Sequence, residues 1–567
     1  MKKLIVFLGS LLLFSSFLHS QVVNDTQIIE GSHWIYQAFD ALSLEAANIS
    51  FTGNTPLSAG ELKLYLKQYD KESLSAAGQK VYEKIENYLY SQKNLFKDKA
   101  YEAALGLKLA PELMYKTNKE IPWTYNYYYK SFPITIDVDT GFSNYISAGG
   151  DFFIGKNYKS SNLPDNFTNL PTGFDQMEFL FPKFCYGSAG MTFDNWGFNI
   201  NTGKEGLKIG NTKTGSIIYN NTFETDGYIQ LSAFTDDYKL TMNIVEISQN
   251  KFLYWHEFDA RFWKKIKISF MEGALINAPF EIRFINPMMI FHSFSFWRNY
   301  ATDMEMHFYN ESHCASYLGV NLEINPIKNL RLYVLYAMNE MQMPNERSGN
   351  NLAYPDSFGL QAGAELKIPT TYDGYWNANL EGIYCAPYLN IKQSPDWSLY
   401  KTRQDMITFS DVKSWIGSPF GPDCFAVDAA FGYEQFDKWS CGLEYLMLIK
   451  GENDFNLFDK KSHYTKQKYN GEDVEVWDYY PYTKCMIAKD NNDDQAREDA
   501  IKQGRYMWMT GIPEYKHQIA LNGMYRINNK MKLEGQLIYS FIFNANHING
   551  KFEQGVQGSI SFAYNVF

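Results

Sequence analysis

The fold is decided by the stretch MKLEGQLIYSFIF, residues 531–543, in which every odd position is apolar or Gly. The same alternation runs before it, over 518–527, and after it, over 556–566. A period of two places the apolar positions on one face of a strand. Strands of about ten or more residues with aromatic rings on the apolar face predict a transmembrane β-barrel, because lipid surrounds a barrel and water fills it.

Length and composition favour such a barrel over the alternative, a soluble all-β protein rich in Tyr. An ordinary globular core does not extend over 567 residues. Aromatic residues make up 17% of the chain, and aromatic belts mark both membrane interfaces of a barrel. Candidate strands recur to the carboxyl end, which predicts an all-β transmembrane barrel of about 16–18 antiparallel strands with a polar lumen. The net charge of −11 argues against a nucleic-acid partner.

The amino-terminal residues predict export. Lys2 and Lys3 precede an apolar run over 4–13, the pattern of a signal peptide, which we place at 1–20. No later run of about eighteen apolar residues follows, so no helix is expected to span a membrane. Together with the strands, this predicts location in the outer membrane, with outer-membrane lipid around the barrel. The terminal Phe567 is an aromatic end of the kind that barrels present to the barrel-insertion machinery.

A helical segment precedes the strands. Trp34 and Leu42 lie along one helix face, and Ser58 with Glu61 three residues later is the arrangement of a capping box. These helices are too polar to enter lipid. We therefore expect a small α-helical periplasmic domain over 21–104.

The barrel is predicted over 105–567, and three long polar segments interrupt its strands. Barrels of this class keep tight turns on the periplasmic side and long loops outside. We therefore assign to the cell surface the segments at 157–176, 391–423 and 451–511.

The sequence offers no site for catalysis or for a metal. The six cysteines include no C-x-x-C pair, and His307 with His313 fits neither a helix face nor a zinc knuckle. No nucleophile elbow, phosphate loop or H-E-x-x-H is present, so we expect a protein that is not an enzyme and has no cofactor. Oxidation of an exported chain could join some cysteines, for example Cys424 with Cys441 across a hairpin, and the pairing stays open.

Glu272 interrupts the apolar face of a predicted strand. A carboxylate among lipid-facing residues is costly at mid-membrane. Either a bulge at Gly273 shifts the register, or this end of the strand lies above the bilayer. Arg283, Asn286 and His292 follow closely and could pair with Glu272, as a salt bridge that fixes a bend or as a ligand site.

The segment 254–297 carries a family resemblance. It opens on YWHEFDARFW, continues through ISFMEGALI and FEIRFINPMMIFH, and closes on an aromatic pair. Within it, His256 opens one strand, Glu272 ends the next, and Asn286 precedes a Pro. With GSPFGPD at 417–423, this segment resembles the Wzi-type capsule-assembly outer-membrane proteins, and the likeness covers most of the mature chain in order.

The resemblance implies an eighteen-stranded barrel with a periplasmic helical bundle, acting as a monomeric, non-catalytic surface lectin for capsular polysaccharide or exopolysaccharide. Aromatic rings stack on sugar faces, and polar side chains in surface loops bind hydroxyl groups. The alternative function is that of a porin or a transporter of small or hydrophobic solutes. The candidate ligand-binding residues are Glu272, Arg283, Asn286, His292, Trp397, Trp415 and Trp477.

Overall fold

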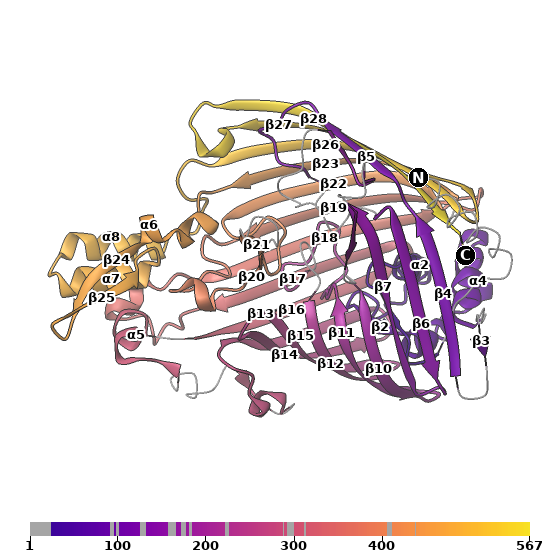
Figure 1. Ribbon diagram of the computed structural model, residues 1–567, viewed down its shortest axis with the longest axis horizontal. Coiled ribbons are helices and arrows are strands. Elements are labelled where there is room, and N and C mark those ends of the chain that lie inside the picture. Colours follow the sequence, from indigo (N-terminus) through magenta and orange to yellow (C-terminus); the bar gives the residue numbers. More distant parts are fainter. Residues whose placement is uncertain are drawn as a thin grey trace.

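Eighteen antiparallel strands close into one barrel in the computed structural model (Figure 1). The predicted transmembrane β-barrel is confirmed. The signal peptide predicted at 1–20 and the terminal Phe567 lie outside the described residues. The structure describes residues 24–90, 96–97, 101–124, 132–156, 166–171, 177–180, 184–220, 226–286, 289–291, 300–310, 313–404, 411–436 and 438–566.

Neighbouring barrel strands pair in chain order. They are β4 (Tyr101–Leu109), β6 (Ile134–Phe142), β7 (Ile146–Lys156), β10 (Cys185–Thr192), β11 (Trp196–Glu205), β12 (Asp226–Thr235), β13 (Tyr238–Ser248), β14 (Lys251–Phe262), β15 (Ile266–Asn277), β16 (Cys314–Ile327), β17 (Leu330–Glu340), β18 (Ser357–Pro369), β19 (Tyr375–Cys385), β22 (Cys424–Gln435), β23 (Trp439–Lys450), β26 (Glu514–Asn528), β27 (Met531–Phe543) and β28 (Phe552–Asn565).

The last strand closes the barrel against the first. Tyr564 of β28 lies opposite Leu109 of β4. The short strand β5 (Glu112–Lys116) continues along β28, with Leu113 opposite Ile560. Two further short strands, β8 (Asn166–Thr168) and β9 (Met177–Leu180), pair with β5 and β7. The seam between the two ends of the barrel sequence is therefore closed by β4 and β5 together.

The wall shows the alternation that the sequence predicts. In β12, Ile229 and Leu231 are exposed on the outside, whereas Gln230 and Ser232 are buried inside. In the closing strands, Leu537 likewise lies exposed on the outer face. Lipid therefore meets apolar side chains, and polar side chains face the interior.

The two ends of the barrel differ in their connections (Figure 1). At the short-turn end, connections of two or three residues join β12 to β13, β14 to β15, β16 to β17 and β26 to β27. Among the helices that the structure describes, none combines the length and the hydrophobicity of a membrane span. The long-loop end carries the segments 278–313, 341–356, 386–423 and 451–513.

The long loops form a structure that we call the cap, most of which lies beyond the barrel, on the left of Figure 1. Its described residues include two small hairpins, four helices and three 3-10 turns. These are α5 (Asp303–Phe308), η7 (Gly349–Ala353), η8 (Pro395–Trp397), β20 (Tyr400–Gln404), β21 (Asp411–Trp415), η9 (Phe455–Phe458), α6 (Lys460–His463), β24 (Tyr464–Tyr469), β25 (Glu472–Trp477), α7 (Pro481–Asp490) and α8 (Asp494–Gly504).

Helices close the short-turn end. The Ser58 side chain accepts a hydrogen bond from the Glu61 N–H at 3.2 Å, as the sequence predicts for a helix start. Phe39 packs in one cluster with Phe234 and Tyr375 of the barrel wall, so helices and barrel share a core. The elements are α2 (Trp34–Ala46), α3 (Ala59–Leu66), η1 (Lys71–Ser73) and α4 (Ala76–Tyr90), with the β1 (Ile28–Ile29) and β2 (Leu57–Ser58) pair.

Residues 206–220, which we call the plug, run inside the barrel between β11 and β12. Ile217 and Ile218 are fully buried. The Tyr317 hydroxyl donates a hydrogen bond to the Ile218 carbonyl at 2.5 Å, and the Gln361 side-chain oxygen accepts one from the Ile217 N–H at 3.0 Å. Two wall strands therefore hold the plug by its backbone.

The lumen is not polar throughout, contrary to the expectation from the strand pattern. Around the plug, inward-facing Trp255, Leu335 and Ile383 are buried in one cluster with the plug isoleucines. The reason is that a segment of the chain, and not water, faces these wall positions. Burial of apolar side chains inside the barrel stabilises the plug in place.

Candidate functional site

The candidate ligand-binding residues fall into two groups in the structure. Glu272, Arg283 and Asn286 lie on or beside the outer wall near β14 and β15. His292 lies outside the described residues. The three tryptophans lie in the cap. The structure therefore does not bring the whole candidate set into one site.

Glu272 faces outward, on the same face of β15 as the exposed Phe270. It lies directly opposite His256 of β14, and Gly273 lies opposite Trp255 in the same unbroken register. A bulge at Gly273 is therefore not what accommodates this carboxylate.

A folded-back loop covers the wall beside Glu272. Residues 278–286 and 289–291, which we call the flap, include the 3-10 turn η4 (Ile282–Ile285). Phe291 is fully buried, and its ring lies 4.9 Å from the ring of His256, the cross-strand neighbour of Glu272. Phe284 packs in the same cluster against Tyr254 of the outer wall. Glu272 and His256, the polar pair on the outer face, are thus next to protein and not to bare lipid.

Arg283 lies on the outer side of the flap. Its guanidinium contacts the Glu281 carboxylate at 2.5 Å and donates a hydrogen bond to the Tyr300 hydroxyl at 2.7 Å. These contacts join η4 of the flap to Tyr300, later in the 278–313 loop. A positioning role for Arg283 within the flap follows directly from them.

Trp415 is a packing residue of the cap. Its ring stacks on Phe455 at 4.3 Å between centroids, with the planes 5° apart. Its Nε1–H donates a hydrogen bond to Asp454 Oδ1 at 2.8 Å. Trp415 is on the 386–423 loop and Phe455 on the 451–513 loop, so the stack joins the two longest loops.

Trp397 and Trp477 meet around Tyr309 in the same aromatic cluster. The Trp397 and Tyr309 rings are 5.7 Å apart, edge to face. The Trp477 backbone N–H donates a hydrogen bond to the Tyr309 hydroxyl at 2.9 Å. Both tryptophans are buried, so their rings form the core that keeps the cap folded.

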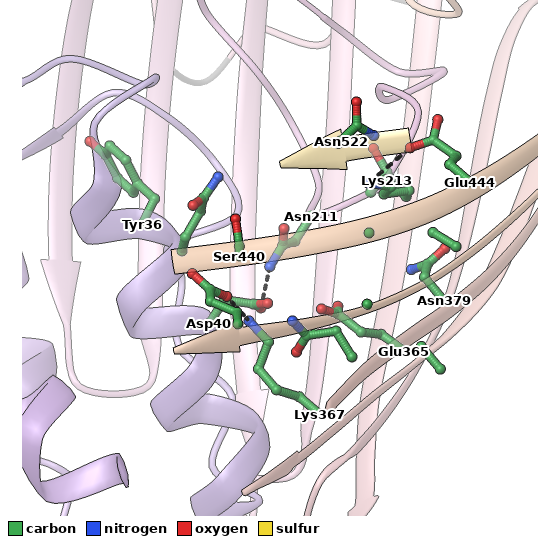
Figure 2. A pocket seen from close by; sticks show the side chains of 18 of the residues that line it. Tyr36, Asp40, Asn211, Lys213, Glu365, Lys367, Asn379, Ser440, Glu444 and Asn522 are labelled. Carbon is green, nitrogen blue, oxygen red and sulfur yellow. Dashed lines mark hydrogen bonds and ion pairs between the residues drawn. The ribbon is translucent and has the colours of Figure 1, made fainter. Parts of the chain in front are cut away.

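A cavity of about 560 Å³ lies inside the barrel, between α2, the plug and the walls of β17–β19, β22 and β23. Figure 2 shows its lining. Carboxylates, ammonium groups and amides from these elements converge on it. Labelled examples are Asp40, Asn211, Lys213, Glu365, Lys367, Asn379, Glu444 and Asn522.

Most charges of this cavity are paired. Asp40 of α2 accepts a hydrogen bond from the Asn211 side chain at 2.6 Å. It also forms an ion pair with Arg331 of β17, which contacts Glu365 of β18 as well. The arrangement joins helix, plug and wall through one buried network.

The electrostatics of the network favour the charged form of Asp40 and disfavour that of Lys208. Burial alone would raise the pKa of Asp40, but the positive charges of Arg331 and Lys367 outweigh it and hold this pKa below its ordinary 3.8. On the plug, burial and the nearby Arg331 lower the pKa of Lys208. A cavity with both signs of charge and several amides can hydrogen-bond a small polar, hydroxyl-rich molecule or ordered water.

Sequence reasoning did not find this cavity. Arg331 and Glu365 occupy the polar faces of alternating strands, which is a signal that they point inward. Their pairing with Asp40 joins positions about 300 residues apart, and local patterns carry no information on such a contact.

Comparison with known proteins gives a fold and no family. No family model matches the chain, and no curated protein matches it. Among solved structures, it is similar to Wzi of Escherichia coli, an outer membrane protein involved in group 1 capsule assembly that is described as a carbohydrate-binding β-barrel. The identity is 10%, the TM-score is 0.53, and the match covers 96% of this chain and 99% of Wzi.

Two other barrels are less similar. OmpT of Vibrio cholerae matches with 9% identity and a TM-score of 0.33, over 83% of this chain and 99% of that chain. OprD of Pseudomonas aeruginosa matches with 10% identity and a TM-score of 0.37, over 82% and 94%. The eighteen closed strands and the likeness to Wzi over nearly the whole chain lead to one conclusion: the protein has the fold of an outer-membrane β-barrel.

Proposed function

We propose that this protein holds a surface polysaccharide at the cell, as a non-catalytic, lectin-like barrel that binds through its cap. The observation that carries the proposal is the closed lumen. The plug and α2 occupy the interior where a general porin has a water-filled channel. A barrel sealed in this way acts at its surface.

The loop lengths support the orientation. Outer-membrane barrels place short turns in the periplasm and long loops outside the cell. The cap is therefore on the cell surface, and the α2–α4 helices are periplasmic. Of the three segments predicted to be surface loops, 391–423 and 451–511 contribute to the cap, and most of 157–176 lies outside the described residues.

The cap offers a firm platform for sugar contacts. Trp397, Trp415 and Trp477 hold its core, and exposed aromatic rings lie near its base. Tyr506 and Trp508 are 48% and 49% exposed. Exposed flat ring faces are the surfaces on which sugar rings stack. Glu272, Arg283, Asn286 and His292 stay predicted contacts.

Wzi, with the same fold over almost its whole length, is described as a carbohydrate-binding barrel, which supports the choice of ligand class. Outer-membrane lipid surrounds the apolar wall. The monomeric state and recognition by the barrel-insertion machinery stay predictions.

The test is retention of polysaccharide from the same cell envelope by the purified barrel in detergent. We expect the wild-type protein to bind and the double variant Tyr506→Ala/Trp508→Ala to bind at least tenfold more weakly. The matched control is Tyr372→Ala, because Tyr372 is 79% exposed at the opposite end of the barrel. Equal binding by all three proteins, or none by the wild type, would contradict the proposal.

A second function, passage of a small polar solute, is favoured by the cavity of about 560 Å³ inside the barrel. Liposome swelling with sugars of increasing size distinguishes it. Swelling driven by the wild-type barrel, combined with no polysaccharide binding, would favour transport.

A further inference from the structure

Two cysteines face each other where the 386–423 loop leaves and rejoins the barrel wall. Cys385 is the last residue of β19, and Cys424 is the first residue of β22. The two are directly opposite in the antiparallel ladder. Both are fully buried and belong to the cluster inside the barrel, so their side chains lie on the same face of the sheet.

Backbone hydrogen bonding shows which kind of ladder pair they form. The Ala386 N–H donates to the Phe358 carbonyl of β18 at 2.9 Å, and the Asp423 carbonyl accepts from the Gly451 N–H at 2.8 Å, so both residues next to the cysteines bond to the strands on their far sides. Hydrogen-bonded and non-hydrogen-bonded pairs alternate along an antiparallel ladder. Cys385 and Cys424 therefore form a hydrogen-bonded pair, the wider of the two kinds.

The Cα spacing of this pair is within the range of a disulfide. Opposed Cα atoms in a hydrogen-bonded pair are about 5.5 Å apart. Disulfides join residues whose Cα atoms are usually about 4.4–6.8 Å apart. In the structure both sulfurs are thiols, and the Cys385 and Cys424 side chains are hydrogen-bond partners.

The other cysteines lack this arrangement. Cys441 lies on the exposed outer face opposite Tyr433, whereas Cys424 lies opposite Lys450. The pairing of Cys424 with Cys441 across a hairpin, one possibility that the sequence left open, is therefore wrong. Cys314 and Cys485 are separated from this pair, under the flap and in the cap.

We propose that Cys385 and Cys424 form a disulfide in the exported protein. In this reaction the two thiols exchange with a protein disulfide of the cell envelope, which is the oxidant. One S–S bond forms between Cys385 and Cys424, the partner disulfide is broken, and its two sulfurs leave as thiols carrying the two protons. The exchange takes place as the barrel folds, before both thiols are buried.

The cross-link lies at a junction of the cap. Next to it, Asp423 accepts hydrogen bonds from the Asn453 N–H at 3.0 Å and the Thr510 N–H at 3.1 Å, both on the 451–513 loop. A disulfide at this base closes the 386–423 loop covalently. It thereby keeps Leu399 and Ile416 of this loop packed in one cluster with the plug isoleucines.

The experiment is thiol mapping of the full-length protein purified from outer membranes, with free thiols blocked by N-ethylmaleimide at lysis. Because two of the six cysteines are linked, we expect four blocked cysteines and one linked peptide pair spanning Cys385 and Cys424. Reduction before blocking must raise the number to six and remove the linked pair.

Two variants check the assignment. Cys385→Ser must convert Cys424 into a blocked thiol, and Cys441→Ser must leave the linked pair unchanged. Complete blocking of both Cys385 and Cys424 in unreduced wild-type protein would overturn the proposal. Since this result comes from the wild type, it is decisive even if Cys385→Ser fails to insert.

Discussion

The two ends of this barrel are sealed by different chemistry. At the short-turn end, charged side chains of the helices pair with charged side chains of the wall. Lys239 of β13 meets Glu61 of α3 at 2.7 Å, and both are almost fully buried. Arg331 of β17 meets Asp40 of α2. The inward face of the wall is polar at this end. A segment that packs against it must therefore pair with its charged and polar side chains.

At the long-loop end, aromatic rings pack on one another beyond the wall. Tyr354 stacks on Tyr482 at 4.2 Å, and Trp415 stacks on Phe455 at 4.3 Å. These two stacks join loop to loop, but other contacts join the cap to the wall: Lys401 of β20 pairs with Asp226 of β12 at 2.7 Å, and Leu399 and Ile416 pack in the cluster inside the barrel. The helices at the short-turn end, which we call the helix seal, share their core with the barrel, whereas the cap has in addition an aromatic core of its own, which we expect to open while the barrel stays folded.

The largest expected effect is at the helix seal. Glu61→Ala leaves the Lys239 ammonium buried without its partner, and breaking a buried pair on one side costs about 3–5 kcal/mol. We expect this loss in the free energy of unfolding of the whole barrel, measured by urea titration in detergent. The double variant Glu61→Leu/Lys239→Met must regain most of it, because the unpaired charge is gone. If Glu61→Ala lost almost none of its free energy of unfolding, the distinction between the two ends of the barrel would be wrong.

The next effect is at the cap. Trp415→Ala removes a buried ring and its stack on Phe455, which costs about 3 kcal/mol in local stability. We expect limited proteolysis to cut the 451–513 loop much faster, while the urea midpoint of the barrel stays within error of the wild type. If the barrel midpoint fell with the cap, the cap would not be a separate core.

A pH effect further sharpens the picture of the cap. The Glu305 carboxylate hydrogen-bonds His313 at 3.1 Å and raises the His313 pKa above its ordinary 6.5, despite partial burial. Burial alone would raise the Glu305 pKa, but hydrogen bonds from His313 and Thr302 hold it below its ordinary 4.5.

The two pKa shifts determine how the stability of the cap changes with pH. The His313 contribution is complete below pH 6.5 and is lost as pH rises through the raised pKa, and the Glu305 contribution is present above pH 4.5 and is lost as pH falls through the lowered one. Cap resistance to proteolysis is therefore greatest between these values. Because the pair is partly exposed, the change toward pH 8 is at most about 1 kcal/mol. His313→Asn, which tolerates the positive φ of 57° there, must flatten the profile.

The smallest effect is expected at an exposed ion pair. Lys468 and Asp473 are 2.5 Å apart on the β24–β25 hairpin, but their side chains are 72% and 64% exposed. Lys468→Ala is expected to change cap stability by less than about 0.5 kcal/mol. The same proteolysis assay measures it and supplies the baseline for Trp415→Ala.

The local features of the fold could be predicted from the sequence. A period of two in 531–543 gives the strands and their lipid-facing side, and Ser58 with Glu61 gives a helix start. The plug could not be predicted, because its backbone is held by Tyr317 and Gln361 of distant strands. Barrel closure decides which side chains lie together, and no local sequence pattern carries that information.

The candidate site shows the same limit. The three tryptophans are candidate ligand-binding residues because they lie in polar, aromatic loops, and those loops do form the cap. Their burial depends on Tyr309 and Phe455, which come from other loops. Glu272 was found because it breaks an apolar stripe, while the flap that covers its neighbour His256 is a tertiary feature.

The most direct test of the central claim is single-channel conductance of the purified protein in planar bilayers. The closed lumen predicts that the wild-type barrel gives no stable open channel, whereas a variant lacking plug residues 207–219 gives channel openings. A steady, water-filled conductance from the wild type, equal to that of the plug deletion, would contradict the claim that this barrel is sealed and acts through its surface.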